Sequence, residues 1–262
     1  MHRILLLITL LGHLATLRAQ VSDRKEIEMD RIKNSVVLFT FGQSNSANYG
    51  QGGKYLYTPR HEVYNYFNQK LYMAQDPLLG ATGKGGSVWG ITGDLLIEKK
   101  KAQAVTIIPI GIGGVKISEW AKGGVHHQLL EKTLDDIVRL GIQIDCICWH
   151  QGESDNIANT TSAQYMEKFL EIREAFRKRG IQAPFVVAVA SYHPLCLEED
   201  HGCSKEIRDA QKELARKYKD IHQGPDTDKL NKVYQRADGI HFSHVGQRQH
   251  AEMWAKILAR IL

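Results

Sequence analysis

The sequence has no apolar run long enough to cross a membrane after its first residues, and it shows no internal repeat or low-complexity linker. Strong charge of one sign is also missing, because the formal net charge of +5 is scattered over 262 residues. These absences argue against a membrane-spanning protein, a repeat protein and a nucleic-acid-binding protein. The 12 histidines include no known zinc spacing such as His-Glu-x-x-His, so we expect no metal and no cofactor.

Cysteine is scarce, with four residues in the chain. Cys146 and Cys148 alternate within a predicted strand, where residues i and i+2 are too far apart for a disulfide, so we interpret them as core thiols. Cys196 and Cys203 flank a short polar loop, which a disulfide would close in an exported protein. Their spacing does not fit a Cys-x-x-Cys redox or metal site.

Residues 1–20 are predicted to be a secretory signal peptide. Met1-His2-Arg3 provides a basic start, a short apolar core follows, and Ala19 precedes a polar segment. The apolar core is too short for a membrane anchor. We therefore expect an exported protein, periplasmic or extracellular, with one domain over residues 21–262.

Apolar runs alternate with amphipathic segments along that domain. This alternation predicts an α/β fold with a parallel central sheet and helices on both faces. The last helix is expected to begin after Phe242, with Ser243 as its N-cap. The predicted strands and helices cover residues 36–41, 105–110, 145–149 and 185–189, and residues 128–140, 162–179 and 204–218, respectively.

A small hairpin insertion is predicted after the first strand. Residues 63–67 and 70–73 are strand-like, and Asn68-Gln69 between them fits a two-residue turn. Six of the ten tyrosines lie between residues 49 and 72. They could form an aromatic platform for a sugar in a substrate cleft, or they could pack the hairpin onto the body of the protein.

Polar residues follow the predicted strands at the edge where ligands collect in open α/β sheets. Ser44 follows the first strand in the position of a nucleophile, although a plain turn with Asn45 as a helix cap also fits this stretch. Gly111-Ile112-Gly113-Gly114 follows the second, and glycines there let backbone N–H groups approach a ligand. His150-Gln151-Gly152-Glu153 follows the third, where an abrupt polar cluster favours a site.

Asp238 and His241 lie three residues apart just before the last helix. A carboxylate there can hold the histidine tautomer and leave the other ring nitrogen as a general base. Together these elements predict that Ser44 attacks a carbonyl while His241 moves the proton. The oxyanion would be met by the N–H of Ser44, the N–H of Gly114 or Gly113, and the side-chain amide of Gln151.

Four blocks together resemble the SGNH (GDSL-like) hydrolases, and more narrowly the sialate O-acetylesterase and acetyl xylan esterase group of carbohydrate esterases. The resemblance runs from about Val36 to Leu262, and the blocks follow the order of that group. Ser46 departs from the methionine of many relatives, which leaves the nucleophile unaffected. The blocks are Gly42-Gln43-Ser44-Asn45, Gly113-Gly114, His150-Gln151-Gly152-Glu153 and Asp238-x-x-His241.

The resemblance implies a flavodoxin-like, three-layer α/β/α sandwich and metal-free ester hydrolysis with Ser44, His241 and Asp238 as catalytic residues. Gln151 stands where the wider superfamily has an oxyanion-hole asparagine. Glu153 could orient Gln151 or the histidine, or serve as a second acid. The residues expected to support the site are Gln43, Asn45, Gly113, His150 and Glu153.

The expected function is a secreted carbohydrate O-acetylesterase, whose partner is an acetylated carbohydrate. Acetyl xylan or a related plant glycan is the first choice of substrate, and 9-O-acetyl sialic acid is the second. Two other classes remain as alternatives: a metal-dependent hydrolase, and a non-catalytic glycan-binding module that kept the fold. Amidase and lipase activities also occur within such a superfamily, but the chain has no long apolar lid-like segment that would favour a lipase.

Overall fold

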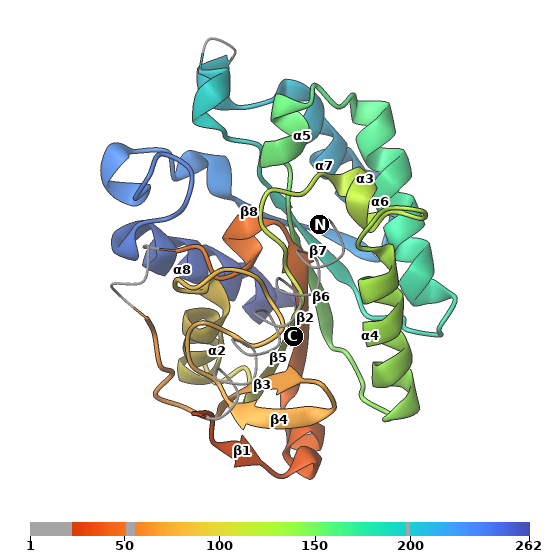
Figure 1. Ribbon diagram of the computed structural model, residues 1–262, viewed down its shortest axis with the longest axis vertical. Helices are drawn as coiled ribbons and strands as arrows, with labels where there is room; N and C mark the ends of the chain where they lie inside the picture. The colour runs from red at the N-terminus through yellow and green to blue at the C-terminus, as the bar shows by residue number, and fades with distance from the viewer. Residues whose placement is uncertain (1–22, 51–55, 198–199) are drawn as a thin grey trace, which may run out of the picture.

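The computed structural model describes residues 23–50, 56–197 and 200–262 (Figure 1). The predicted signal peptide lies outside these described residues. The sheet of the described chain has the strand order β1-β4-β3-β5-β2-β6-β7-β8. Its strands are β1 (Glu26–Ile27), β2 (Val36–Gly42), β3 (Val63–Phe67), β4 (Lys70–Met73), β5 (Val105–Pro109), β6 (Cys146–His150), β7 (Phe185–Val189) and β8 (Ile221–Asp226).

Strand β2 lies at the centre of the sheet, with β5 on one side and β6 on the other, and both pairings are parallel. Its residues are almost all buried, as the uncharged sequence predicts for a strand covered on both faces. The chain adds β5 on one side of β2 and then crosses to add β6 on the other. The carboxyl end of β2 is therefore the topological switch point of the sheet, where ligands bind in such folds.

Helices cover both faces of the sheet, so the predicted three-layer arrangement is confirmed (Figure 1). Phe39 and Phe41 point to one face, against α4 and α6, while Leu38 points to the other, against α2 and α8. This is the period-two alternation of a strand. The α-helices are α2 (Val88–Glu98), α3 (Ile117–Trp120), α4 (His127–Arg139), α5 (Glu153–Ile157), α6 (Ser162–Arg177), α7 (Lys205–Lys217) and α8 (His244–Ile261).

The predicted hairpin is confirmed as β3 and β4, and its turn residues Asn68 and Gln69 have φ of 48° and 63°. Positive φ at both positions is what a type I′ turn requires. The hairpin is part of the main sheet rather than a separate insertion, because β3 pairs in parallel with β5. Its tyrosines are buried: Tyr64, Tyr66 and Tyr72. They therefore pack the hairpin onto the body and form no sugar platform.

Helix α2 and strand β8 are among the elements that the sequence did not predict. Helix α2 was not indicated by its sequence, because nearly every side chain on it is apolar or buried and no polar face marks the helical period. Strand β8 includes Gly224, Pro225 and Asp226, which are poor strand formers, and it forms through pairing with β7.

One of the two predictions about the cysteines is confirmed. Cys146 and Cys148 are fully buried in β6, and burial raises the pKa of the Cys146 thiol to about 12. The loop that carries Cys196 and Cys203 is closed at its base by a 2.8 Å bond from His193 N to Gly202 O. A disulfide between Cys196 and Cys203 stays a prediction. Across the described ranges, none of the helices combines the length and apolar character needed to span a bilayer.

We expect Phe41→Ala to lower the free energy of unfolding by about 3–5 kcal/mol, because the change leaves a large cavity in the core. The Phe41 ring lies 4.6 Å from the Trp149 ring and 5.5 Å from the Trp120 ring, centroid to centroid. Urea unfolding measures the loss. Val233→Ala is the control, because Val233 is 93% exposed and should change stability little. Equal stability of the two variants would contradict this description of the core.

Candidate active site

The end of β2 is held against the end of β6. Gly42 pairs with His150, and Gln43 N donates to His150 O at 3.0 Å. Gly42 has φ of 128°, and a Cβ there would lie 2.0 Å from His150 O, so no other residue fits this approach. The chain then turns into the short 3₁₀ helix η2 (Ser44–Ser46), where Ser44 is 4% exposed. The sequence therefore places Ser44 at the switch point of the sheet.

Two backbone N–H groups in this region are available to a ligand. Among the described residues, the N–H groups of Ser44 and Gly114 have no hydrogen-bond partner. Gly113 differs, because its N–H donates to Thr82 Oγ1 at 2.9 Å. The sequence did not decide between Gly113 and Gly114 as an oxyanion donor, and the geometry favours Gly114.

Asp238 and His241 form the expected pair on the loop before α8. His241 Nδ1 lies 2.6 Å from Asp238 Oδ2, and Asp238 Oδ1 accepts the backbone N–H groups of Ile240 and His241. Burial raises the pKa of Asp238, but the hydrogen bonds from His241 and the backbone outweigh it, and the pKa is lowered. The ionised carboxylate keeps a proton on Nδ1 and leaves Nε2 of His241 for proton transfer.

Neighbouring side chains connect Ser44 with the loop that carries the Asp238–His241 pair. Ser44 and Phe242, the residue after His241, line one cavity of about 10 Å³. The Tyr49 ring stacks on the His241 ring at 5.2 Å. No hydrogen bond joins Ser44 to His241 in the described contacts, and such bonds often tighten only when substrate is bound. Tyr49 was not singled out by the sequence, because only the stacking distinguishes it from the other tyrosines.

Arg236 holds the loop that carries the Asp238–His241 pair. Its guanidinium is buried and donates to the carbonyl oxygens of Leu230, Ile240 and Thr227 at 2.6, 2.5 and 3.2 Å. It also lies 4.0 Å from the centre of the Phe242 ring, a cation–π contact. Sequence reasoning missed Arg236, because an arginine between polar loop residues resembles a solvated side chain.

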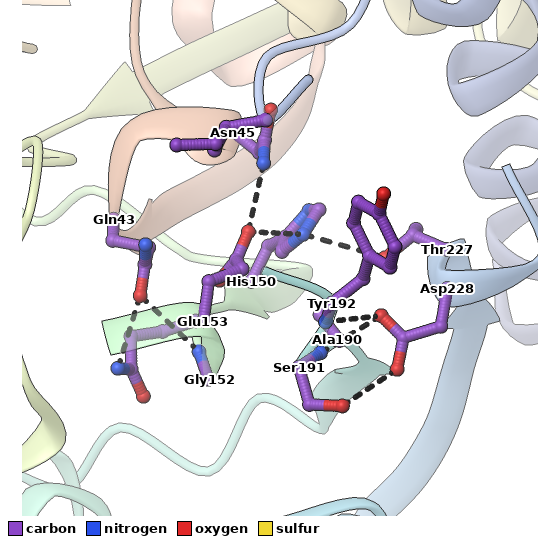
Figure 2. A network of polar contacts seen from close by, with 12 residues as sticks. Gln43, Asn45, His150, Gly152, Glu153, Ala190, Ser191, Tyr192, Thr227 and Asp228 are labelled. Atoms are coloured by element: carbon purple, nitrogen blue, oxygen red, sulfur yellow. Dashed lines mark hydrogen bonds and ion pairs between the residues drawn. The ribbon is translucent and has the colours of Figure 1, made fainter. Parts of the chain in front are cut away.

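A buried polar network connects Asn45, on the turn after β2, with Glu153 and His150 (Figure 2). Asn45 Nδ2 donates to Glu153 Oε1 at 2.8 Å, and that oxygen lies 3.5 Å from His150 Nε2. His150 Nδ1 is 3.1 Å from His250 Nε2, which also accepts the indole N–H of Trp254 at 2.9 Å. The network thus links the nucleophile turn to helix α8. Asn45, His150 and Glu153 therefore belong to one buried network, and their role in supporting the site stays a prediction.

Glu153 is an ionised carboxylate inside this network. Burial alone would raise its pKa, but the hydrogen bond and charge of His150 and the Asn45 amide lower the pKa to about 2. His250 is different, because burial and the charge of His150 lower its pKa well below the ordinary value, and it stays neutral. A carboxyl group whose pKa is lowered is unsuited to act as a second catalytic acid. Its contacts indicate that it fixes Asn45 and His150.

The amide of Gln151 does not fit the donor role that the sequence predicts for it. Its Nε2 is directed at three internal acceptors: Gln43 Oε1 at 3.2 Å, Val115 O at 3.1 Å and Asp155 Oδ2 at 2.5 Å. An amide nitrogen carries two hydrogens, so neither is left for a substrate oxygen. The sequence pattern around Gln151 is the one expected for an oxyanion donor. The direction of its amide hydrogens depends on the acceptors around it, which the sequence does not show.

In the chain that the structure describes, no group of three or more His, Cys, Asp or Glu side chains could hold a metal ion. The site described above consists of a serine, a His–Asp pair and open backbone N–H groups at the switch point of a parallel sheet. This fold and this arrangement of residues fit the SGNH (GDSL-like) class of ester hydrolases that the sequence resembles.

The chain belongs to the family described as carbohydrate esterase, sialic acid-specific acetylesterase, whose match covers residues 34–260. It is therefore an ester hydrolase of the carbohydrate acetylesterase type. A comparison with curated proteins found no match.

Solved structures share the fold at low identity. A protein from Arabidopsis thaliana is 18% identical, with a TM-score of 0.66, over 86% of this chain and 98% of its own. A carbohydrate acetylesterase from Sinorhizobium meliloti is 12% identical, with a TM-score of 0.55, over 87% of this chain and 100% of its own. A carbohydrate acetylesterase from Xanthomonas citri is 14% identical, with a TM-score of 0.53, over 86% of this chain and 55% of its own.

We expect Glu153→Gln to destabilise the fold by about 3 kcal/mol near neutral pH, because it removes the charge that pairs with His150. A lowered pKa means that the ionised form stabilises the fold above the ordinary pKa of 4.5, and that this contribution is lost as pH falls toward 2. The stability gap between wild type and variant should therefore narrow over that range. Urea unfolding at several pH values measures it.

The control is Glu167→Gln, because the Glu167 side chain is 66% exposed. Its stability should follow wild type at every pH. A Glu153→Gln gap that stays constant down to pH 2 would show that the Glu153 charge does not stabilise the network.

We expect Arg236→Met to reduce kcat/KM by roughly 10–100-fold, because misplacing a catalytic group by about 1 Å has an effect of this size. The methionine fills similar space but leaves three carbonyl oxygens without their donor. Ester hydrolysis measures the loss. Arg248→Met, which removes a half-exposed arginine from α8, is the control and should keep wild-type rates. A folded Arg236→Met variant with unchanged kcat/KM would show that Arg236 does not hold this loop in place for catalysis.

Proposed function

We propose that this protein is an exported carbohydrate O-acetylesterase that uses Ser44, His241 and Asp238. The observation that carries the proposal is the 2.6 Å His241–Asp238 pair, because the next residue, Phe242, lines one cavity with Ser44. The open N–H groups of Ser44 and Gly114 add the means to stabilise an oxyanion. Export rests on the signal peptide that the sequence predicts.

The proposed reaction has two steps. Ser44 Oγ attacks the acetyl carbonyl carbon, and His241 Nε2 takes the serine proton. The tetrahedral oxyanion is held by the backbone N–H groups, and the sugar alcohol leaves with the proton from His241. Water then attacks the acetyl-serine with the same histidine as base, which releases acetate and restores Ser44.

A neutral acetylated glycan, such as acetyl xylan or a related plant polysaccharide, is the proposed substrate. Asp238, with its side chain 56% exposed, adds negative charge at the mouth of the site. Arg236 supplies no compensating contact for a substrate carboxylate, because backbone carbonyls occupy its guanidinium. The second candidate is 9-O-acetyl sialic acid, which the family description favours.

Acetate release from acetylated xylan and from 9-O-acetyl sialic acid, measured in parallel, tests the proposal. We expect wild type to release acetate faster from xylan and Ser44→Ala to lose roughly 10⁶-fold in kcat, as when a serine nucleophile is removed. Ser118→Ala, in the short helix α3, is the matched control. Equal rates for Ser44→Ala and wild type would exclude a serine esterase. Faster release from the sialic acid would replace xylan as the substrate.

A further inference from the structure

We propose that His193 binds the sugar that carries the acetyl ester, by donating the hydrogen on its Nε2 to a free hydroxyl group of that sugar. This inference rests on the proposed function, because it concerns the sugar alcohol that leaves when Ser44 attacks the ester. It gives a role to a histidine outside the motifs of the sequence. The position of His193 in the fold and the partners of its two ring nitrogens support this role.

His193 lies at the edge of the sheet where the site is. It follows β7, which pairs in parallel with β6, and β6 pairs in parallel with β2. Parallel strands end at the same edge, so the loop after β7 leaves the sheet on the side where Ser44 follows β2. The loop that carries His193 is therefore a neighbour of the nucleophile turn in space, although the two are distant in sequence.

The residues on either side of His193 contact the loop before α8, which carries the general base. The Arg236 guanidinium lies 5.1 Å from the centre of the Tyr192 ring. A Cβ placed on Gly239 would lie 3.7 Å from Cγ of Pro194. Because Tyr192 and Pro194 both pack on that loop, the backbone of His193 is held beside it.

The charges that act on His193 also indicate that its ring lies near the reacting groups. Burial lowers the pKa of His193, and the charge of His241 lowers the pKa further, while the charge of Glu153 opposes both effects. A charge shifts the pKa of another group only when the two are close. The imidazole of His193 therefore lies near that of His241 and is neutral at neutral pH.

One ring nitrogen of His193 is occupied and the other is open. The backbone N–H of Leu195 donates to Nδ1 at 3.2 Å, so the hydrogen of the neutral ring lies on Nε2. In the described chain Nε2 has no hydrogen-bond partner, and it is not among the fully buried polar atoms that lack one. Although His193 is only 8% exposed, its Nε2–H therefore reaches accessible space.

Hydrogen bonds fix the loop that presents this donor. Asp228 accepts the backbone N–H groups of Ser191 and Tyr192 at 2.8 and 2.9 Å, and Figure 2 shows these bonds. His193 N donates to Gly202 O at 2.8 Å. A donor that is already held in place loses little freedom when a substrate binds, so more of its hydrogen-bond energy contributes to affinity.

A sugar hydroxyl group is the partner that fits this donor. The neutral ring carries no charge that would select a carboxylate, and its single N–H matches an alcohol oxygen. His193 does not act as a base in this state, because Leu195 N–H occupies its acceptor nitrogen. In the proposed reaction His241 protonates the leaving alcohol, so the sugar lies beside His241 and within the neighbourhood of His193.

Two variants separate the donor from the bond within the loop. In His193→Gln the amide nitrogen can replace Nε2, whereas in His193→Asn the amide oxygen can replace Nδ1 and the donor is lost. We expect His193→Asn to lower kcat/KM for acetylated xylan roughly 10-fold, the order for one lost hydrogen bond, and His193→Gln to stay within about threefold of wild type. For 4-nitrophenyl acetate, which offers no sugar hydroxyl, both variants should stay within about threefold.

The control is His222→Asn, the same change at an exposed position near the amino end of β8, which should keep wild-type rates on both substrates. Rates are expressed per folded molecule, from near-UV circular dichroism. If wild type prefers 9-O-acetyl sialic acid, that ester replaces xylan in the comparison, because it also carries free hydroxyl groups. If His193→Asn does not fold, His193→Phe, which keeps a flat ring and lacks the donor, decides by the same criterion.

The outcomes separate this inference from the proposed function. If folded His193→Asn keeps kcat/KM for the sugar ester within about threefold, the inference is overturned while the esterase stands. Equal losses on the sugar ester and on 4-nitrophenyl acetate would show that His193 only supports the loop, and would also overturn it. If Ser44→Ala is as active as wild type, or if wild type hydrolyses neither sugar ester, the proposed function and this inference fail together.

Discussion

The parallel pairing of β2 with β5 on one side and β6 on the other is the constraint on which the site depends. Parallel strands end at the same edge of a sheet, so three loops distant in sequence meet at one place. Gly42 makes the closest approach possible, because its lack of a Cβ lets β2 lie against His150. The apolar faces of β2 fix its register, since a shift of one residue would turn Phe39 and Phe41 away from their layer.

Around the turn that carries Ser44, the cost of burying charged side chains is balanced by hydrogen bonds. Glu153 stays ionised in the interior because Asn45 and His150 surround its oxygen. Removing either partner would leave the buried charge without compensation and would destabilise the fold. Arg236 plays the same part for the loop before α8, where carbonyl oxygens surround a buried cation. Glu153 joins the turn of Asn45 to the end of β6, while Arg236 fixes the segment between β8 and α8 through the carbonyl oxygens of that same segment.

Much of the fold could be predicted from the sequence, because its elements carry local signals. The alternation of apolar strands with amphipathic helices indicated the layers, and Asn68-Gln69 indicated the hairpin turn. Helix α2 gave no such signal, since its side chains are apolar or buried on all sides. Strand β8 gave none either, since its pairing with β7 overrides residues that disfavour strands.

The sequence by itself determined which residues could do chemistry: a serine after a buried strand, an Asp-x-x-His pair, and glycine and glutamine blocks at strand ends. Asp238 and His241 pair locally, so their spacing alone was enough to place one beside the other. The tertiary structure decided that the amide of Gln151 is not free to donate to a substrate. Its hydrogens are directed at acceptors on other loops, such as Gln43 Oε1 and Val115 O. A hydrogen-bond network of this kind depends on distances across the fold, which no local pattern records.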